Sequence, residues 1–301
     1  MKSATSWKST PNLTSVIVSA TETPNLEGMK RARALAATAP RIHPDDLAPP
    51  GWQRMRELAW HIPRVLAHLG HVGPRGPEDG PPALVIPGFL AGDRTTMDMR
   101  RALARAGWRV HPWSLGVNRG AKTDTMDLLG RRLSEIYDGR PILVVGWSLG
   151  GMFARELAHL HPEKIRAVVT LCSPFSGDYK TNTNVRELYE RVAGHDVNEP
   201  PFPRSEGKPP VPTLAFWGSR DGIVSRRSAR GLDHEVDRAI EIDTHHIGAV
   251  LFRPAVSRIV RGISAFLTEV EGRPLELHPR LDDVVGPSPW KTAWTRLDSH
   301  N

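Results

Sequence analysis

Ser148 lies in a segment whose residue types and spacing could carry out nucleophilic chemistry. The chain reads GWSLGG over residues 146–151, directly after an apolar run and directly before a helical pattern. A G-x-S-x-G turn between a strand and a helix holds its serine in a strained conformation with the hydroxyl exposed. The glycines are needed because neighbouring backbones approach closely there. Taken alone, the segment indicates either a reactive nucleophile or an ordinary glycine-rich turn.

Residues that could activate such a serine follow two later apolar runs. Asp221 comes after TLAFWG, and His245 and His246 come after AIEID. Because the carboxyl ends of parallel strands lie at one edge of a sheet, side chains that follow such strands can meet. The order Ser, Asp, His is that of a nucleophile, an orienting acid and a general base in acyl transfer. The spacing therefore favours the reactive serine, with Ser148 and Asp221 paired to one of the two histidines.

Acyl transfer also needs two N–H donors for the oxyanion. Leu149, the residue after the serine, supplies one N–H at a helix N-terminus. We expect Phe89, which follows the first apolar run in the segment PGFL, to supply the other. Leu90 and Trp147 are expected to line an apolar substrate pocket, which would suit an acyl chain or an aromatic group.

Apolar runs alternate with helical patterns from residue 83 onward. This alternation is typical of βαβ units and predicts an α/β fold, a mostly parallel sheet of about six strands with helices on both faces. The expected strands are 83–89, 107–113, 142–147, 165–173, 213–218 and 239–243. The expected helices are 95–106, 123–137, 149–160, a short one near Ser225, and 254–267.

The remaining segments suggest how the chain is organised. Residues 1–50 are rich in Ser, Thr, Pro and charge and are predicted to be a disordered or weakly structured arm, within which Met29 could be the biological start. Residues 51–271 form the predicted domain, which begins with a helical pattern over 52–69. An irregular stretch at about 174–212, with one possible helix at 184–194, is predicted to be a lid insertion. Residues 272–301 form a C-terminal tail.

Composition excludes several classes of protein. The single cysteine, Cys172, lies in an apolar run, so we expect a buried, inert thiol and no intrachain disulfide. No apolar run reaches the length of a signal-peptide core or of a transmembrane helix, which predicts a cytoplasmic protein. The net charge of +7 is spread through helices without a basic, aromatic-rich block, so we expect no nucleic-acid partner. The paired histidines lack an HExxH motif, and we expect no metal and no cofactor.

The sequence resembles the α/β-hydrolase superfamily, and within it the bacterial lipase- and esterase-like serine hydrolases. The matching segments are VIPGFLAGD, GWRVHPWSLGVNRG, VVGWSLGG, WGSRDGIVS and HHIGAVLFRPAV, which together span roughly residues 80 to 270. The resemblance implies an α/β-hydrolase fold and cleavage of a small carboxylic ester. It also favours His246 over His245 as the base, because the family's histidine precedes x-Gly. Trp147 stands where many lipases have histidine, and PGFL replaces the HGGG loop of many esterases, so the substrate is left open.

Other functions are compatible with these residues. An acyltransferase would use the same Ser148, Asp221 and His246 and pass the acyl group to an alcohol or thiol. A non-catalytic binding protein could share the fold, since a fold does not fix a function. A nucleic-acid binder would rely on the +7 charge alone. The oligomeric state is not predicted by any of these features.

Overall fold

A six-stranded parallel sheet forms the centre of the structure. The computed structural model describes residues 43–67 and 76–272, and the predictions for the rest of the N-terminal arm, for Met29 and for residues 273–301 lie outside this part. The strand order is β2-β1-β3-β4-β5-β6, and all neighbouring pairs are parallel. The strands are β1 (Pro82–Ile86), β2 (Arg109–Pro112), β3 (Ile142–Trp147), β4 (Ile165–Leu171), β5 (Thr213–Gly218) and β6 (Arg238–Ile242). The predicted sheet is confirmed, and β3 and β5 have the expected bounds.

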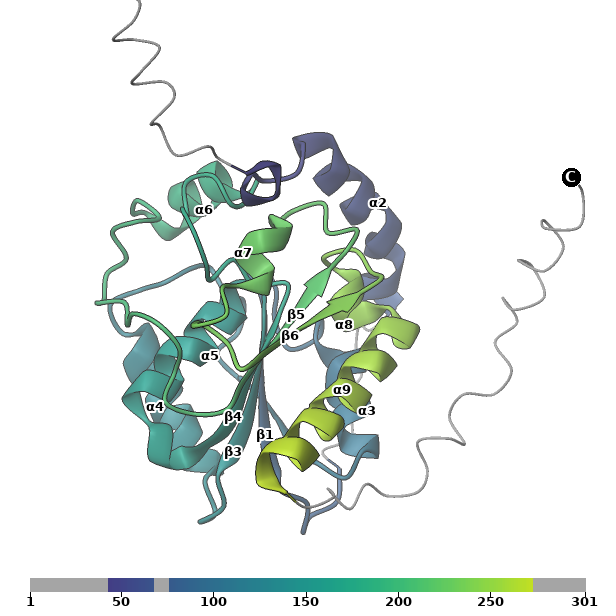
Figure 1. The fold of residues 1–301 in the computed structure, drawn as a ribbon, viewed down its shortest axis with the longest axis vertical. Coiled ribbons are helices and arrows are strands. Elements are labelled where there is room, and N and C mark those ends of the chain that lie inside the picture. The colour runs from purple at the N-terminus through teal and green to yellow at the C-terminus, as the bar shows by residue number, and fades with distance from the viewer. Residues whose placement is uncertain (1–42, 68–75, 273–301) are drawn as a thin grey trace, which may run out of the picture. The chain divides into compact units, whose positions relative to one another are not determined.

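Helices cover both faces of the sheet, as the alternating pattern predicts (Figure 1). Helices α4 (Thr125–Ile136) and α5 (Leu149–Leu160) pack on one face. Helices α3 (Met97–Arg105), α8 (Gly248–Leu251) and α9 (Arg253–Glu271) pack on the other. Successive strand residues point to opposite faces, so Val85 joins the cluster under α9 while Leu84 joins the cluster under α5. The sheet is therefore buried on both sides, which explains why its strands are continuous apolar runs.

The N-terminal helix α2 (Gly51–Ala67) continues without interruption through Pro63. Three of its apolar side chains, Trp52, Met55 and Leu58, are exposed. A 3-10 helix, η1 (Pro44–Asp46), precedes it, and the Ala48 N–H donates to the Thr181 carbonyl at 2.8 Å. The described end of the predicted arm thus contacts the insertion between β4 and β5.

That insertion, residues 174–212, contains α6 (Arg186–Ala193), inside the stretch where the sequence suggested a helix. Aromatic side chains from it, including Phe175, Tyr179 and Phe202, line a cavity of about 330 Å³ beside α5. Its function as a lid stays a prediction. The remaining short elements are η2 (Pro162–Lys164) and α7 (Arg226–Arg230), which follows the N-cap Ser225.

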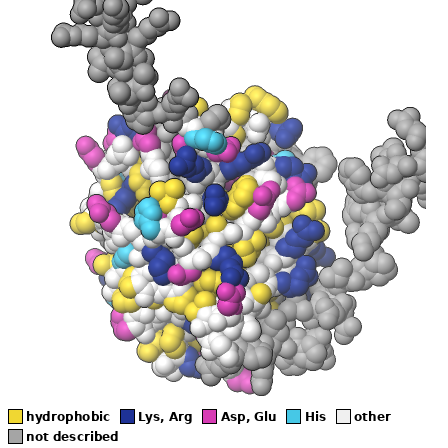
Figure 2. Space-filling view, in the orientation of Figure 1, with side chains coloured by type: hydrophobic (Ala, Val, Ile, Leu, Met, Phe, Trp, Pro, Cys, Tyr) yellow, Lys and Arg dark blue, Asp and Glu magenta, His cyan; other side chains and the backbone are white. Residues whose placement is uncertain are grey.

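Charged side chains of both signs are interspersed on the face shown in Figure 2. Within residues 43–67 and 76–272, none of the helices combines the length and apolar character that crossing a bilayer requires. Cys172 is fully buried, as expected. The cytoplasmic location and the absence of a nucleic-acid partner stay predictions.

Candidate active site

Ser148 occupies a strained position between β3 and α5. Its backbone has φ 54° and ψ −122°, a positive φ that costs a residue other than glycine about 1–3 kcal/mol. The surrounding glycines make the turn sterically possible. A Cβ on Gly146 would lie 2.2 Å from the Gly150 carbonyl oxygen, and one on Gly150 would lie 2.3 Å from the Ile86 carbonyl oxygen. The sequence GWSLGG therefore forms the tight strand-to-helix turn that a nucleophile elbow requires.

Asp221 and His246 form a buried pair beyond the ends of β5 and β6. The distance between His246 Nδ1 and Asp221 Oδ2 is 2.9 Å, and 3% of His246 and 5% of Asp221 are exposed. The other carboxylate oxygen, Oδ1, accepts the N–H groups of Ile223 and Val224, both at 2.9 Å. In the neutral imidazole this arrangement keeps the proton on Nδ1 and leaves the Nε2 lone pair free to accept a proton. The neighbouring His245 instead contacts the Arg220 carbonyl oxygen through Nδ1 at 2.9 Å.

The surroundings of His246 favour its charged form. Burial lowers the pKa of this histidine, but the charge and hydrogen bond of Asp221, together with the charge of Glu57, raise it above its usual value. Burial, followed by Asp221, also raises the pKa of the Cys172 thiol far above its usual range. Potential metal-ligand atoms of Cys172, Asp221 and His246 lie within 4.8 Å of one another. A metal ion binds a cysteine as the thiolate, and the raised pKa of Cys172 disfavours that form. Asp221 is already hydrogen-bonded to His246, so this cluster is poorly suited to hold an ion.

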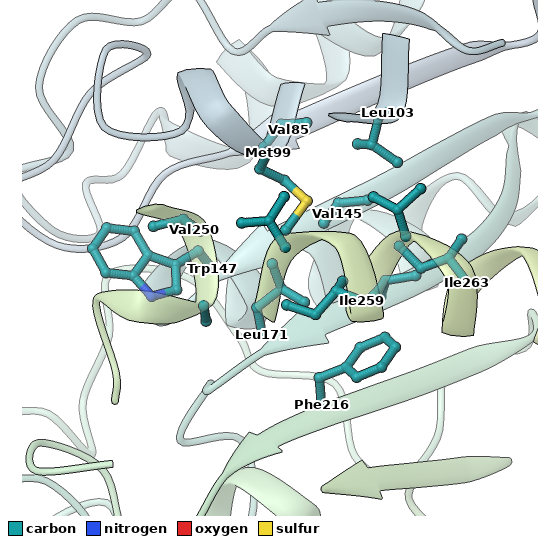
Figure 3. Close-up of a cluster of buried hydrophobic side chains, with 14 of the residues drawn as sticks. Val85, Met99, Leu103, Val145, Trp147, Leu171, Phe216, Val250, Ile259 and Ile263 are labelled. Atoms are coloured by element: carbon teal, nitrogen blue, oxygen red, sulfur yellow. The ribbon is translucent and has the colours of Figure 1, made fainter. Parts of the chain in front are cut away.

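Trp147 connects the serine turn to the histidine turn. Its indole Nε1 donates to the His246 carbonyl oxygen at 3.1 Å, and the two rings are 5.5 Å apart. The indole is 6% exposed and lies in the core cluster with Val250 and Leu171 (Figure 3). The residues that line the 330 Å³ cavity do not include Trp147, and its expected contact with substrate stays a prediction. In the part of the chain that the structure describes, no hydrogen bond joins the Ser148 hydroxyl to His246.

The loop after β1 lies against the serine. A Cβ on Gly88 would lie 3.0 Å from the Ser148 Cβ, a tight contact that glycine avoids. Neither the Phe89 N–H nor the Leu149 N–H donates a hydrogen bond to another described residue, which leaves both available to a ligand. Leu90, at φ 57°, is 48% exposed.

Asn118 holds this loop. Its Nδ2 donates to the Pro87 carbonyl oxygen at 2.8 Å, and its own carbonyl oxygen accepts the Leu90 N–H at 2.7 Å. Its N–H donates in turn to the Ala91 carbonyl oxygen at 2.8 Å. The side chain is 1% exposed. Asn118 thus fixes the backbone on both sides of Phe89.

Sequence reasoning missed two buried polar residues beside the site, Asn118 and Glu57. Asn118 lies in the segment GVNRG, which looks like an exposed turn. Glu57 lies among apolar residues in the first helical pattern, where a charged residue is expected on the solvated face. The interruption of the apolar pattern at Glu57 was a feature from which its burial could have been suspected. The sequence around Asn118 contains no comparable feature.

Comparison with known proteins agrees with the topology of the sheet. The family model described as "alpha/beta hydrolase fold" matches residues 123–200, which include β3, Ser148 and α5. Together with the six-stranded parallel sheet, this match agrees with the expected α/β-hydrolase fold.

Individual proteins resemble parts of the chain. The biotin biosynthesis bifunctional protein BioHC of Teredinibacter turnerae is 40% identical over 58 residues, which are 19% of this chain and 10% of that protein. The chain thus matches about a tenth of this curated relative. A membrane phospholipase A, described as a bacterial virulence factor, is 17% identical with a TM-score of 0.46, covering 82% of this chain and 98% of its own. Carboxylesterase CesB of Bacillus subtilis is 13% identical with a TM-score of 0.45, covering 71% and 98%. Similarities at this level do not bear on the substrate.

Proposed function

We propose that the protein is a serine hydrolase that cleaves carboxylic esters through an acyl-enzyme intermediate. The observation that carries this proposal is the buried hydrogen bond of 2.9 Å between His246 Nδ1 and Asp221 Oδ2. It lies at the same edge of the sheet as the strained turn of Ser148, because all three residues follow the carboxyl ends of parallel strands.

The first half of the reaction forms the acyl-enzyme. His246 Nε2 takes the hydroxyl proton of Ser148 as Oγ attacks the ester carbonyl carbon, and the carbonyl π electrons move to oxygen. The resulting imidazolium is stabilised by Asp221. The tetrahedral intermediate then collapses, the C–O bond to the alcohol breaks, and His246 returns its proton to the leaving alkoxide. Water repeats the sequence with His246 as base, which releases the acid and regenerates Ser148.

The oxyanion of each tetrahedral intermediate is stabilised by the N–H groups of Phe89 and Leu149. Both donors are free of other described partners, and the close approach of Gly88 to Ser148 brings the first near the reacting oxygen. The loss of one such donor commonly lowers kcat about 10²- to 10³-fold. This part of the site therefore supplies charge stabilisation, while His246 supplies proton transfer.

An ester with an apolar acyl chain or an aromatic group is the proposed substrate. The cavity of about 330 Å³ borders Leu149, the residue after the nucleophile, and its walls include Phe153, Tyr189 and Phe202. Its volume lies near the lower end of the range for small-molecule pockets. A series of p-nitrophenyl esters of increasing acyl length measures how much of this cavity the acyl group uses.

Covalent labelling tests the proposal. A fluorophosphonate probe is expected to attach to Ser148 of the wild type and not to the Ser148→Ala variant, which should also lose p-nitrophenyl ester hydrolysis. Ser257→Ala, on α9, is the matched control and should behave as the wild type. Full turnover by a folded Ser148→Ala variant would overturn the proposal. Product analysis with a competing alcohol separates hydrolysis from acyl transfer, since a transferase would yield the new ester.

A further inference from the structure

Glu57 is a buried carboxylate that the proposed mechanism does not use. It lies on α2, ahead of the segments that resemble the hydrolase family, and 2% of the residue is exposed. Its Oε1 accepts the Gly222 N–H at 2.6 Å, and its Oε2 accepts the Ile247 N–H at 3.2 Å. These two residues directly follow Asp221 and His246. One carboxylate therefore bridges the turn that carries the acid and the turn that carries the base.

The surroundings of Gly222 are shaped to admit this contact. A Cβ at Gly222 would lie 2.8 Å from Glu57 Oε1 and 2.9 Å from the Gln53 Cβ, so a side chain there would push α2 away. The Gly222 carbonyl oxygen is held as well, because Asn184 Nδ2 donates to it at 2.8 Å. In Figure 1, α2 runs beside α8, the short helix that begins directly after the histidine turn.

The contact also brings negative charge close to the imidazole. The titratable groups around His246 are Asp221, the Cys172 thiol at the end of β4, the neighbouring His245 and Glu57. His245 Nδ1 lies 3.9 Å from Glu57 Oε1, which is beyond hydrogen-bond distance. Burying a carboxylate is costly when only backbone N–H groups compensate it, and a neutral side chain would hold α2 in place at lower cost. The presence of a carboxylate at position 57 is explained if its negative charge has a role.

We propose that Glu57 is a positioning residue of the active site, which aligns the Asp221 and His246 turns and adds its negative charge to that of Asp221 beside the imidazolium. This inference rests on the proposed serine hydrolase function. It extends the functional unit to the N-terminal helix.

Two substitutions separate alignment from charge. Glu57→Gln keeps the size and one acceptor oxygen but removes the charge. Its kcat is expected to fall about 10- to 100-fold with KM within twofold, the range for one lost charge-assisted hydrogen bond. The acid limb of its kcat/KM profile should move to lower pH, because an imidazole with one fewer negative neighbour loses its proton more readily. Glu57→Asp keeps the charge but is too short to reach both N–H groups, so its kcat should fall while the acid limb stays near that of the wild type.

The control is Arg56→Gln, which changes the charge of the exposed side of the same helix and should leave both kcat and the acid limb unchanged. A merely structural role for Glu57 would lower the unfolding temperature of Glu57→Gln without moving the acid limb. That result, or a kcat within twofold of the wild type, would overturn the inference. If Glu57→Gln does not fold, Glu57→Asp decides the question. A lowered kcat with an unchanged acid limb supports the inference, and a kcat within twofold of the wild type overturns it.

An NMR titration of the His246 imidazole in the wild type and in Glu57→Gln provides a readout that needs no turnover. It should show a lower midpoint in the variant, and equal midpoints would contradict the inference. Failure of the fluorophosphonate probe to label wild-type Ser148 would instead count against the proposed hydrolase function. The two failures are therefore distinguishable.

Discussion

Replacing Asn118 with alanine tests how the loop of the proposed oxyanion site is held. The substitution removes the bond from Nδ2 to the Pro87 carbonyl oxygen, at 2.8 Å, and the bond that Oδ1 accepts from the Gly120 N–H, at 3.2 Å. Because the side chain is 1% exposed, both partners lose their hydrogen bonds in a buried setting. Each loss costs about 1–2 kcal/mol, so the free energy of unfolding should fall by about 2–4 kcal/mol.

This loss of stability corresponds to a fall in Tm of roughly 4–16 °C for a domain of this size. The backbone bonds between Asn118 and the loop remain in the variant, so Phe89 is loosened rather than released. We therefore expect kcat to fall about 10- to 100-fold, less than the complete loss of an oxyanion donor. KM should change little, because the donor acts mainly on the transition state.

The assay combines thermal unfolding with steady-state hydrolysis of a p-nitrophenyl ester. Asn118→Asp is the informative partner, because it can still accept the Gly120 N–H but cannot donate to Pro87, and it should be impaired about as much as Asn118→Ala. Asn198→Ala, at an exposed position, should match the wild type. An Asn118→Ala variant with lowered Tm but kcat within twofold of the wild type would refute the proposed link between this side chain and the oxyanion loop.

Three further predictions concern the base, the nucleophile turn and the indole. The kcat/KM of the wild type should fall as pH drops through a value above 6.5, because the raised pKa of His246 keeps the base protonated at higher pH; a limb at or below 6.5 would contradict this. Gly151→Ala, whose Cβ would lie 2.0 Å from Ser173 Oγ, should lower the urea-derived free energy of unfolding by about 1–3 kcal/mol, whereas Gly51→Ala, with open space around it, should not. Trp147→Phe removes the donor to the His246 carbonyl and should cost about 1 kcal/mol of stability and several-fold in kcat, and unchanged values of both would rule out a positioning role.

The sequence was sufficient to predict the sheet because its strands are buried on both faces. Runs such as ILVVGW and TLAFWG are continuous and apolar, and β3 and β5 begin and end where these runs do. Helices away from the central sheet were predicted less well. Helix α8 has only four residues, too few for a helical period to be recognised, and α2 leaves Trp52 and Met55 exposed although its pattern is amphipathic.

The residues of the candidate site also fall into those that the sequence could predict and those that it could not. Ser148, Asp221 and His246 could be proposed from their order and from their positions after apolar runs, because parallel topology brings strand ends together. The contacts of Trp147 could not, since the direction of its indole depends on how β3 packs against α8. Glu57 and Asn118 act through backbone groups of distant loops, and no residue type in those loops marks them as partners. A side chain that hydrogen-bonds to a backbone group does not require a particular residue type at its partner position, so such a contact cannot be recognised from the sequence.

The order of synthesis gives the contact of Glu57 with the two turns a further consequence. Glu57 is separated from Gly222 by 165 positions and from Ile247 by 190. A growing chain that has emerged as far as β5 has the serine turn and α2, but it has neither Asp221 nor His246, the residues proposed to activate the serine. Contacts over such separations form late, since closing the intervening chain costs entropy before it is rewarded. If Ser148 is the nucleophile, as proposed, the nascent protein is thus expected to carry an unactivated serine until nearly the whole domain has been made, which would protect it from premature acylation.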